Sequence, residues 1–572
     1  MLTQRLTGLI AGALLLLTPA VYASDVSDYR GSWEYRALSH QSEIDRNAPF
    51  GKASFLTTHN SYNAGVYSQN GSYIDPNHKI SLTDQLQIGI RALELDVHHT
   101  FSSSGFWPWE WKFSQELKLS HANGDTGTHP NDRFFTQGLQ EIRNWLNVNP
   151  DEVLIIYLED HMEGHYDKAI GEMNGIIGDL VYKPGGCKRL PMDLSKADVL
   201  AAGKQILLIG GNCATTNWAN YVFNGHFSST ESLENFVPCP TCTAGNKDVA
   251  YIQSHLVRIY EDSTTLSALF GDPGPPITAD DAAQMAECGI GAIGLDQVVP
   301  FDSRLKAQIW SWGENEPNDA GGEDCAEQRS DGRFNDLPCS TMRCVACQNP
   351  SNGDWFITDG AYTWAEARTA CDTEFPGEAL VFGVPVNGYE NALLRDLKTG
   401  LGIDAVWINY SDRLNEGQWV ANPYDNRALG KPTAQSSTYN GTAHAAHAAR
   451  AVDGNPNGNW AAGSVTHTNS DPNAWWQVDL GAQTDISRIE LANRTDCCAD
   501  RLSHFYLFIS DAPMGNRPLA DLLVDDSVTR HYQESLSETT LTLPVSAQGR
   551  YVKIQLDGTG ILSLAEVEVY GE

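Results

Sequence analysis

Basic residues are scarce in this sequence of 572 residues. Lys and Arg together number 38 against 72 Asp and Glu, which gives a formal net charge of −34. Proteins that bind nucleic acid neutralise phosphates with Lys and Arg, so we expect no nucleic-acid partner. The same balance argues against attachment to anionic lipid by charge alone, and any membrane contact must have another basis.

Long apolar runs are also missing, apart from one short run at the N-terminus. Leu6 to Leu17 is too short for the roughly 20 residues of a membrane-spanning helix, and no later stretch qualifies. Arg5 precedes this run and the small-residue motif Val21-Tyr22-Ala23 follows it. That pattern is typical of a secretory signal peptide. We therefore expect residues 1–23 to be a signal peptide and the mature protein to be secreted and soluble.

Paired cysteines or histidines at zinc-finger spacing are absent as well. Cys239-x-x-Cys242 and Cys344-x-x-Cys347 could each begin a zinc site, but no second pair follows at that spacing. The twelve cysteines also fit an oxidising compartment. Zinc therefore stays open but is the less favoured interpretation.

Three zones of different composition follow the signal peptide. Residues 24–308 alternate apolar strands with helices, which predicts an α/β fold of TIM-barrel size. Residues 309–425 are rich in Trp, Gly, Asn and Cys, with weak helix periodicity. Residues 426–572 alternate apolar and polar positions between Gly and Pro, as all-β sandwiches do. The strand candidates of the first zone are Ala53–Thr57, Ala92–Val97, Leu117–Ser120, Val153–Leu158, Gln205–Ile209 and Ala292–Leu295, and its helix candidates are Phe135–Leu146 and Ala279–Cys288.

Polar residues of one chemical kind end four of these strands. A closed parallel barrel presents the carboxyl ends of its strands at one mouth, so we expect these side chains to converge there. Each segment alone could be an ordinary turn or a solvated strand face, and it is their order that favours a catalytic site. The residues are His59, Asn60, Glu94, Asp96, His121 and Glu159.

The residue types suit the cleavage of a phosphodiester. Carboxylate and amide oxygens are the ligands that calcium prefers, and Glu94 and Asp96 share one face of a strand because side chains alternate. Histidines donate and accept protons near neutral pH. A divalent cation beside two histidines would offset the phosphate charge, lower the pKa of a nearby hydroxyl and leave a histidine to protonate the leaving group.

Four segments together resemble the X-region of phosphatidylinositol-specific phospholipases C, over roughly residues 30–300. Bacterial members of that family often carry an arginine in place of the metal. Here Glu94-Leu-Asp96 and Leu158-Glu159-Asp160 resemble the calcium-dependent type instead. The segments are Thr58-His59-Asn60-Ser61-Tyr62, Arg91-Ala-Leu-Glu-Leu-Asp96, Ser120-His121 and Leu154-Ile-Ile-Tyr-Leu-Glu159-Asp-His161.

The resemblance implies a role for each residue. Glu94 would help to deprotonate the inositol 2-hydroxyl, His59 would stabilise the phosphorane-like transition state, and His121 would protonate the departing diacylglycerol oxygen. The first product would be a cyclic inositol phosphate, from phosphatidylinositol or from the glycosylated inositol lipids that anchor surface proteins. The later half shows no Lys/Arg cluster that matches the family's phosphate and inositol contacts, so the head group stays open. The implied ligands of a catalytic calcium ion are Asn60, Glu94, Asp96 and Glu159.

An aromatic run, Phe106 to Phe113, lies between two of the catalytic segments. Exposed at the barrel rim, it would enter a lipid interface, where Trp is favoured, and give peripheral contact with a membrane surface. Buried, it would be a hairpin packed on the barrel. Both interpretations stay open.

Residues 309–425 resemble a C-type lectin-like domain whose two halves stand in reversed order. The segment from Glu316-Pro-Asn318 to Cys339 resembles the second half, and the segment from Trp364 to Trp419 resembles the first. Domains with neighbouring termini tolerate such a circular permutation. The resemblance implies the disulfides Cys325–Cys339 and Cys347–Cys371, and it leaves Cys344, which could pair with Cys288.

This middle module could bind a ligand or serve as a structural element. Calcium and a sugar could be held by four of its residues, but permutation places that site in question and we favour a structural module docked on the barrel. The four residues are Glu316, Asn318, Asn335 and Asp336.

Residues 427–572 closely resemble the F-type lectins, which are jelly-roll sandwiches that bind L-fucose. The motif is His467-x26-Arg494-x-Asp496-x4-Arg501 around Cys497-Cys498. By resemblance His467, Arg494 and Arg501 bond the sugar and Asp496 orients the arginines. Cys497 and Cys498 would form a vicinal disulfide against the apolar edge of the sugar. An ordinary surface ion network is the alternative, against which the adjacent cysteines argue. The implied ligands of a structural calcium ion are the Arg450 carbonyl, Asp453, Asn455, Ser464 and Glu566.

These observations predict an α/β TIM-like barrel followed by a small C-type lectin-like α+β module and an all-β jelly-roll sandwich. The leading hypothesis is a secreted phosphodiesterase of the phospholipase C type that its lectin domain concentrates at fucosylated glycans. One alternative is an adhesin whose barrel has lost activity. Another is a related barrel enzyme for glycerophosphodiesters or sphingolipids, which also use two histidines and a carboxylate-bound metal.

Overall fold

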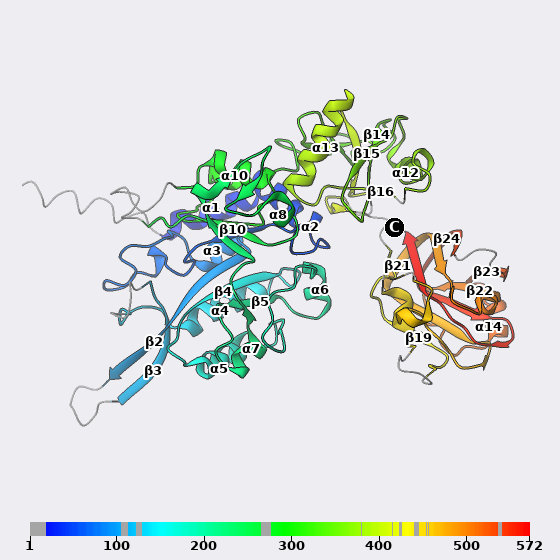
Figure 1. Cartoon of the computed structure of the whole chain (residues 1–572), viewed down its shortest axis with the longest axis horizontal. Helices are drawn as coiled ribbons and strands as arrows, with labels where there is room; N and C mark the ends of the chain where they lie inside the picture. The colour runs from blue at the N-terminus through cyan, green and yellow to red at the C-terminus, as the bar shows by residue number, and fades with distance from the viewer. Residues whose placement is uncertain are drawn as a thin grey trace, which may run out of the picture. The chain divides into compact units, whose positions relative to one another are not determined.

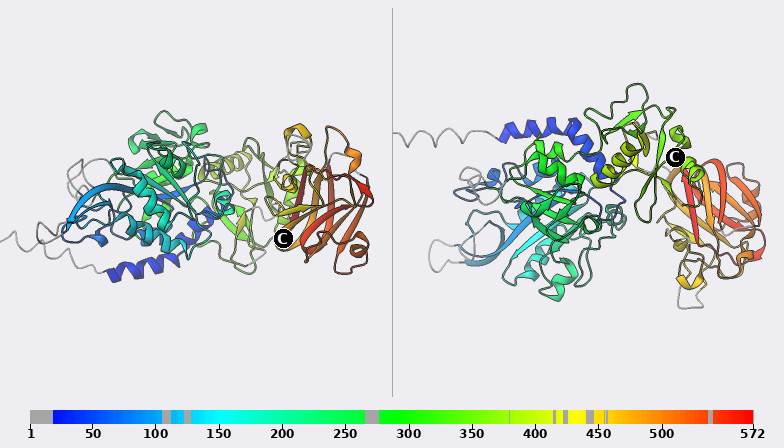
Figure 2. Two further views of the ribbon diagram at one scale, coloured as in Figure 1. Left: turned by 90° about the horizontal axis from the view of Figure 1, so that it is seen from below. Right: turned by 45° about the horizontal axis from the view of Figure 1, so that its top comes forward.

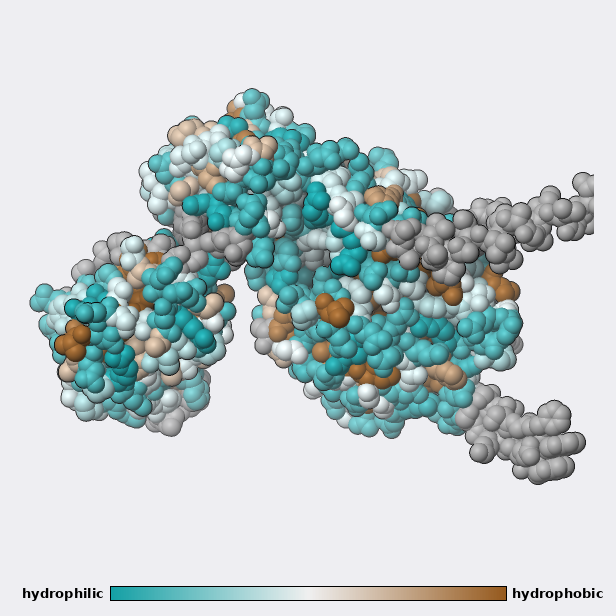
Figure 3. All heavy atoms as spheres, turned by 180° about the vertical axis from the view of Figure 1, so that it is seen from behind, coloured by the Kyte–Doolittle hydropathy of each residue, from teal (hydrophilic) through white to brown (hydrophobic). Residues whose placement is uncertain are grey.

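The chain divides into two compact units, Met1–Ala421 and Asn422–Glu572. Within the described residues, no helix is long and apolar enough to cross a membrane. Hydrophilic residues dominate the surface visible in Figure 3, and apolar residues form small separate groups. The computed structural model describes residues 19–104, 112–121, 128–264, 276–378, 380–413, 416–421, 426–439, 446–453, 455, 457–535 and 540–571.

The first unit contains a parallel sheet whose described strands are β1 (Phe55–Thr58), β2 (Ala92–Ser104), β3 (Lys112–Leu119), β4 (Leu154–His161), β5 (Ile206–Gly210), β6 (Phe223–Asn224), β7 (Ser229–Ser232), β10 (Val257–Tyr260) and β11 (Ala292–Leu295). Their order is β6-β5-β4-β2-β1-β11-β10-β7, and each pair along this path is parallel. Only residues 225–228 separate β6 from β7, which are the two edges of the sheet. The sheet therefore curls until its edges approach each other, and it fits the predicted TIM-like barrel.

The barrel strands are buried apolar runs with helices outside them. Residues 154–158 of β4 and all of β5 are buried, as expected for parallel strands covered on both faces. Helix α4 matches the predicted bounds Phe135–Leu146 and buries Leu139 and Ile142. Helix α10 begins as predicted, where Thr278 caps it with Asp281. The helices described in this region are α1 (Pro19–Arg30), α2 (Trp33–Ile44), α3 (Leu82–Gln87), α4, α5 (Tyr166–Ile176), α6 (Lys196–Ala201), α7 (Thr216–Tyr221), α8 (Val249–Ile252), α10 (Ala279–Glu287) and α11 (Ser303–Ala307).

The prediction that Leu117–Ser120 is a strand of the parallel barrel is wrong. It belongs to β3, which runs antiparallel to β2 from the pair Ser104–Lys112 down to Val97–Leu119. Figure 1 shows the two strands leaving the barrel as an arm. A short apolar run carries no information on strand direction, so the sequence pattern could not distinguish a hairpin from a barrel strand. Positions 106–111 of the aromatic run lie outside the described residues.

The middle module has its own sheet, in the order β13-β12-β17-β14-β15, with β16 paired to β14 and β18 to β17. Its implied disulfides Cys325–Cys339 and Cys347–Cys371 are confirmed. The elements are β12 (Cys325–Gln328), β13 (Phe334–Leu337), β14 (Cys344–Gln348), β15 (Trp355–Ile357), β16 (Val381–Phe382), β17 (Val406–Ser411), β18 (Val420–Ala421), α12 (Ala367–Glu374) and α13 (Gly388–Leu401).

The proposed pairing of Cys344 with Cys288 is wrong. Cys288 ends α10 next to the hairpin of β8 (Phe236–Val237) and β9 (Thr243–Ala244), where it forms a disulfide with Cys242. Cys344 remains a free thiol, as does Cys239. Each Cys-x-x-Cys pair therefore has one member in a disulfide, and neither offers the two thiolates that a zinc site would need.

The second unit is β-rich, with a sheet in the order β19-β21-β24-β22-β23 and with β26 paired to β21. Strands β21 and β24 are long, and their pairing is interrupted by bulges. Residues from both halves of β21, among them Val478 and Leu491, belong to one hydrophobic core. The fold is therefore layered, as predicted for a sandwich, and Figure 2 shows its strands from two sides. The strands are β19 (Thr433–Gln435), β20 (Asp471–Pro472), β21 (Trp475–Ala492), β22 (Ser503–Ser510), β23 (Thr529–Ser535), β24 (Thr540–Leu556), β25 (Thr559–Gly560) and β26 (Glu566–Gly571), with the helix α14 (Leu519–Leu523).

Candidate active site and carbohydrate site

Three carboxylates meet where β2 and β4 pair, with Glu94 and Asp96 near the start of the long strand β2 and Glu159 near the end of β4. Asp96 lies opposite Glu159 in the parallel ladder, and Glu94 shares the face of Asp96 because side chains alternate. One oxygen from each of the three lies within 4.8 Å of the others. Burial, then Glu159 and Glu94, raise the pKa of Asp96 well above its usual value. Carboxylates this close repel one another, so the group is suited to a bound cation.

Asn60 completes this oxygen-rich group. Its backbone adopts a left-handed conformation with φ 48°, which asparagine tolerates. Its amide head lies 2.9 and 3.1 Å from the two carboxylate oxygens of Asp96. If the Asn60 amide nitrogen faces Asp96, these contacts are hydrogen bonds. If the amide oxygen faces Asp96 instead, both groups are acceptors, and a cation has to lie between them. The donor set therefore fits a hard divalent cation such as calcium.

His59 follows β1 and forms a buried pair with Asp296, which follows β11. His59 Nδ1 lies 3.4 Å from Asp296 Oδ2, and Asp296 also accepts hydrogen bonds from the Ser263 backbone at 2.6 Å and from Asn77 at 3.1 Å. Burial raises the pKa of Asp296 to about 7, and the hydrogen bonds from His59 and Ser263 oppose that rise by stabilising the charged carboxylate. Burial alone would lower the pKa of His59, but Asp296 outweighs it and raises this pKa to about 9. His59 is therefore an imidazolium at neutral pH.

His121 comes to the same mouth from the hairpin rather than from a barrel strand. The backbone N–H of Ser120 donates to the carbonyl of Asp96 at 3.4 Å, which brings the chain back beside the carboxylate group. His121 is exposed. Partial desolvation at the mouth and the positive His59 lower the pKa of His121, against the opposing effect of Asp262. His59 and His121 therefore rest in different protonation states.

Arg258 on β10 is a residue of the site that sequence reasoning missed. It is 4% exposed and forms an ion pair with Glu94. Burial would raise the pKa of Glu94, but Arg258 and His59 outweigh it and lower this pKa. The available signal was a charge inside the apolar run Leu256-Val-Arg258-Ile-Tyr260. Asp296 was missed too, although it directly follows the predicted strand Ala292–Leu295.

A cleft of about 850 Å³ opens beside these residues. His59, Glu94, Glu159 and Arg258 line it together with Arg189, which is exposed on a loop tied down by the disulfide Cys187–Cys213. The sequence showed no basic cluster because these two arginines lie far apart along the chain. The fold brings both to one cleft, where they can contact an anionic substrate.

Two further histidines lie two positions beyond the carboxylates Asp96 and Glu159 and therefore on the same face of the sheet. His98 and His161 are opposite each other in the ladder of β2 and β4, and their rings stack with centroids 4.3 Å apart. His161 Nε2 lies 2.9 Å from Glu159 Oε1, and burial and then His161 lower the pKa of His98 to about 4. The stacked pair therefore contacts Glu159 through His161, and His98 supports the His161 ring.

The four polar residues of the lectin motif also converge. His467 Nδ1 donates to the carbonyl of Thr468 at 2.7 Å, so the neutral ring leaves Nε2 as the acceptor for Arg501 at 3.1 Å. Arg494 donates to both Asp496 oxygens, at 2.9 and 3.0 Å, and this ion pair lowers the pKa of Asp496 to about 2. The arrangement is a fixed set of donors with one imidazole acceptor, which suits sugar hydroxyls.

Aromatic rings that sequence reasoning missed surround this set. The Arg494 guanidinium lies 5.0 Å from the centroid of Trp460, and Tyr439 lies 4.7 Å from His467 between ring centroids. The disulfide Cys497–Cys498 is confirmed at the same place in the chain. Such rings supply flat apolar surface beside the polar groups.

The implied ligands of the structural calcium ion lie on adjoining segments. Asp453 Oδ1 accepts the N–H of Asn455 at 3.0 Å, just after the 3₁₀ helix η4 (Ala448–Val452), which carries Arg450 and packs on β26. Glu566 begins β26. The backbone N–H of Thr466 donates to the carbonyl of Leu564 at 2.8 Å, so the segment that contains Ser464 lies next to the start of β26.

The middle module brings together part of its candidate site. The backbone N–H of Asn318 donates to Asp336 at 2.9 Å, and the Asn318 amide donates to Glu316 at 2.5 Å. The side-chain amide of Asn335 donates to the carbonyl of Asp336 at 2.8 Å. A separate acidic group, Asp319, Asp324 and Glu416, has oxygens within 4.8 Å of one another.

Known families match both ends of the chain. Residues 14–302 match the family described as the Rv2075c PI-PLC-like domain, and residues 450–554 match a NedA-like, galactose-binding domain. The uncharacterized protein Rv2075c of Mycobacterium tuberculosis is 32% identical over 405 residues, which cover 67% of this chain and 80% of that protein. A fucolectin of Anguilla anguilla is 32% identical over 148 residues, which cover 25% of this chain and 90% of the fucolectin. Among solved structures, a fucose binding module of Streptococcus pneumoniae is 37% identical, with 28% of this chain and 100% of the module covered and a TM-score of 0.23.

Proposed function

Because the chain belongs to the Rv2075c PI-PLC-like family and carries a C-terminal domain of the fucolectin type, we propose that it is a secreted, lectin-targeted phosphoric diester hydrolase. Its substrate is an inositol phospholipid or a glycosylated inositol lipid anchor, and its products are diacylglycerol and a cyclic inositol phosphate. The observation that carries this proposal is the meeting of His59, the three carboxylates and Arg258 at one cleft.

The residues of the cleft divide the chemistry between them. The His59 imidazolium, held by Asp296, and the Arg258 guanidinium face the phosphate and stabilise the negative charge of the transition state. Glu94 stays deprotonated and accepts the proton of the attacking hydroxyl. His121 donates a proton to the leaving oxygen, because an arriving phosphate raises the pKa of a nearby imidazole.

Asn60, Glu94, Asp96 and Glu159 would hold the calcium ion. Bound there, calcium would offset charge on the phosphate and lower the pKa of the attacking hydroxyl. The Arg258–Glu94 ion pair favours a second candidate, in which the arginine provides the positive charge without a metal. Calcium dependence distinguishes the two.

Glu94→Gln is expected to lower activity and calcium affinity together. The loss should be at least the roughly 10–100-fold known for residues that support metal ligands, because Glu94 would contact the ion directly. Calcium binding is measured by calorimetry and turnover is measured with and without a chelator. Glu163→Gln is the matched control, since Glu163 is a nearby glutamate just beyond the end of β4 that pairs with His99 and not with the carboxylate group. Full activity of the wild type in chelator would reject the calcium site and favour the arginine.

The basic limb of the pH–rate profile should lie near pH 9, where His59 loses its proton. The rate is therefore maintained below that pH and declines above it. Asp296→Asn removes the partner that raises the pKa of His59, so the limb should move down toward the ordinary imidazole value of about 6.5. Values of kcat at saturating substrate between pH 5 and 10 test this, because kcat reports the complex in which bound phosphate has raised the pKa of His121. An unchanged limb in Asp296→Asn would assign it to another group.

Product analysis tests the reaction itself. Phosphatidylinositol is incubated with the purified protein, with and without calcium, and the water-soluble product is identified by phosphorus NMR. A cyclic inositol phosphate supports the proposal. Glycerol phosphate from glycerophosphodiesters would instead indicate the related barrel enzymes, and no turnover on either would indicate an adhesin.

The C-terminal domain would bring this enzyme to fucosylated glycans through His467, Arg494 and Arg501, with Cys497–Cys498 against the sugar. Relatives of this domain are fucolectins, which supports the assignment. A structural calcium ion would be held by the segments of Asp453 and Glu566. Attachment through glycans requires no basic surface, which agrees with the net charge of −34 and allows peripheral action at a membrane. The middle module is proposed to be a permuted C-type lectin-like domain with a structural role.

A further inference from the structure

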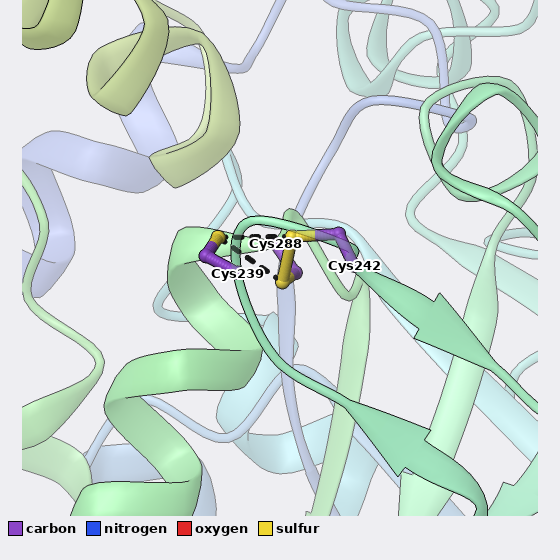
Figure 4. A group of neighbouring side chains, drawn as sticks. All are labelled: Cys239, Cys242 and Cys288. Carbon is purple, nitrogen blue, oxygen red and sulfur yellow. Dashed lines mark hydrogen bonds between the residues drawn. A yellow bond between two sulfur atoms is a disulfide. The ribbon is translucent and has the colours of Figure 1, made fainter.

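Three cysteines gather at the end of α10. Cys239 and Cys242 lie in the loop between β8 and β9, and Cys288 directly follows α10. Cys242 and Cys288 form a buried disulfide, whereas Cys239 is an exposed thiol. The Sγ atom of Cys239 lies 2.9 Å from that of Cys242 and 3.4 Å from that of Cys288. Figure 4 shows the thiol turned toward both sulfur atoms.

The second free thiol provides a comparison. Cys344 is half-buried, and among the described residues no disulfide sulfur lies within hydrogen-bonding distance of it. A free cysteine in this protein is therefore not in general placed against a disulfide. The position of Cys239 is specific to the hairpin loop, and it places a nucleophilic atom beside the two sulfur atoms it could attack.

The sulfur cluster lies where the barrel meets the middle module. Glu287, at the end of α10, forms an ion pair with Arg395 of α13 at 2.8 Å. Gln253 donates to the carbonyl of Cys288 at 3.1 Å and accepts from Asn387, which caps α13, at 3.0 Å. The Cys242–Cys288 bond thus ties the β8–β9 hairpin to the helix end that supports α13.

We propose that Cys239, Cys242 and Cys288 form a thiol–disulfide exchange site. The Cys239 thiolate attacks Sγ of Cys242, so that a Cys239–Cys242 bond forms and the Cys242–Cys288 bond breaks. The electron pair leaves on Sγ of Cys288, which takes up the proton that Cys239 released. One thiol and one disulfide stand on each side of the reaction, so it needs no oxidant or reductant. The product releases the hairpin from α10.

Two features keep the Cys242–Cys288 form as the resting state. Partial burial of the Cys239 sulfur, and then the negative Glu287, raise the pKa of Cys239, and only the thiolate attacks a disulfide. The leaving thiolate of Cys288 would arise at the C-terminus of α10, where the helix dipole disfavours negative charge. Exchange is therefore slow and reversible, and the hairpin link opens in a minor population.

The test uses the full chain with Cys344→Ser, which leaves Cys239 as the single thiol. The protein is incubated with iodoacetamide and then digested in acid without reduction. The disulfide-bridged and the alkylated peptides are identified by mass spectrometry. Exchange predicts alkylation at Cys288 together with a Cys239–Cys242 bridge. The Cys288 label should be about tenfold or more above that in the double variant with Cys239→Ser, where no attacking thiol exists.

A second variant keeps the test decisive. In Cys344→Ser with Cys288→Ser, Cys239 and Cys242 are the two cysteines without another disulfide partner, and they should pair and leave no thiol to alkylate. Two outcomes overturn the proposal. One is equal labelling of Cys288 with and without Cys239, which would come from a fraction of the protein whose Cys242–Cys288 disulfide is reduced. The other is a Cys288→Ser protein in which Cys239 and Cys242 both stay free under oxidising buffer.

Discussion

His59→Ala is expected to lower the rate of phosphodiester cleavage by at least about 10²-fold, the range known for lost acid–base and electrostatic catalysis. The reason is that His59 carries a positive charge at the cleft, which Asp296 stabilises through a hydrogen bond of 3.4 Å. Alanine removes that charge and leaves Asp296 buried beside a void. His121→Ala should cause a loss of similar size, because it removes the proton donor for the leaving oxygen. Initial rates on phosphatidylinositol vesicles measure both.

A matched histidine distinguishes catalysis from folding. His255 stacks on Tyr251 with ring centroids 3.9 Å apart and does not line the cleft, so His255→Ala should keep the wild-type rate. All three variants should keep their retention on a fucose resin, since that site belongs to the other compact unit. Wild-type rates in both His59→Ala and His121→Ala would show that the active site lies elsewhere.

Arg494→Ala should abolish retention on a fucose resin while turnover of a soluble substrate stays at the wild-type level. Each hydrogen bond to a charged group contributes about 1.5–3 kcal/mol, so the loss of two such bonds corresponds to at least about 100-fold in Kd. The substitution also leaves Asp496 without its bidentate partner and removes the guanidinium that lies over Trp460. Glycan binding is measured by calorimetry with fucose.

The domain contains its own control for this prediction. Arg517 and Asp525 form another Arg–Asp pair, at 2.7 Å, outside the lectin motif. Arg517→Ala removes a comparable surface ion pair and should leave fucose binding unchanged. If both arginine variants lose binding equally, the effect of Arg494→Ala is one of folding, and the sugar lies elsewhere.

The sequence predicted those parts of the site that follow from strand ends. His59, Asn60 and Glu159 stand next to strands whose apolar runs are easily recognised. Asp296 obeys the same rule and could have been found by applying it to the last strand. Arg258 could not, because a lone charge inside an apolar run identifies neither its partner nor its direction, and only the fold brings it to Glu94.

Two errors came from information that local patterns do not contain. The direction of β3 depends on its antiparallel pairing with β2, which the residues of β3 do not specify. The partner of Cys288 depends on which loop the barrel places beside α10, and Cys242 becomes its neighbour only in three dimensions. Both concern long-range pairing, whereas the bounds of α4 and the start of α10 were predicted correctly.

The antiparallel ladder of β2 and β3 makes the position of the base of the arm independent of the length of the arm. Its base fixes the position of His121, the proposed proton donor, because pairing of Val97 with Leu119 sets where His121 emerges. Residues added or removed in matched numbers beyond the pair Ser104–Lys112 leave that base unchanged. The reach of the arm can therefore be altered by design without displacing the His121 imidazole.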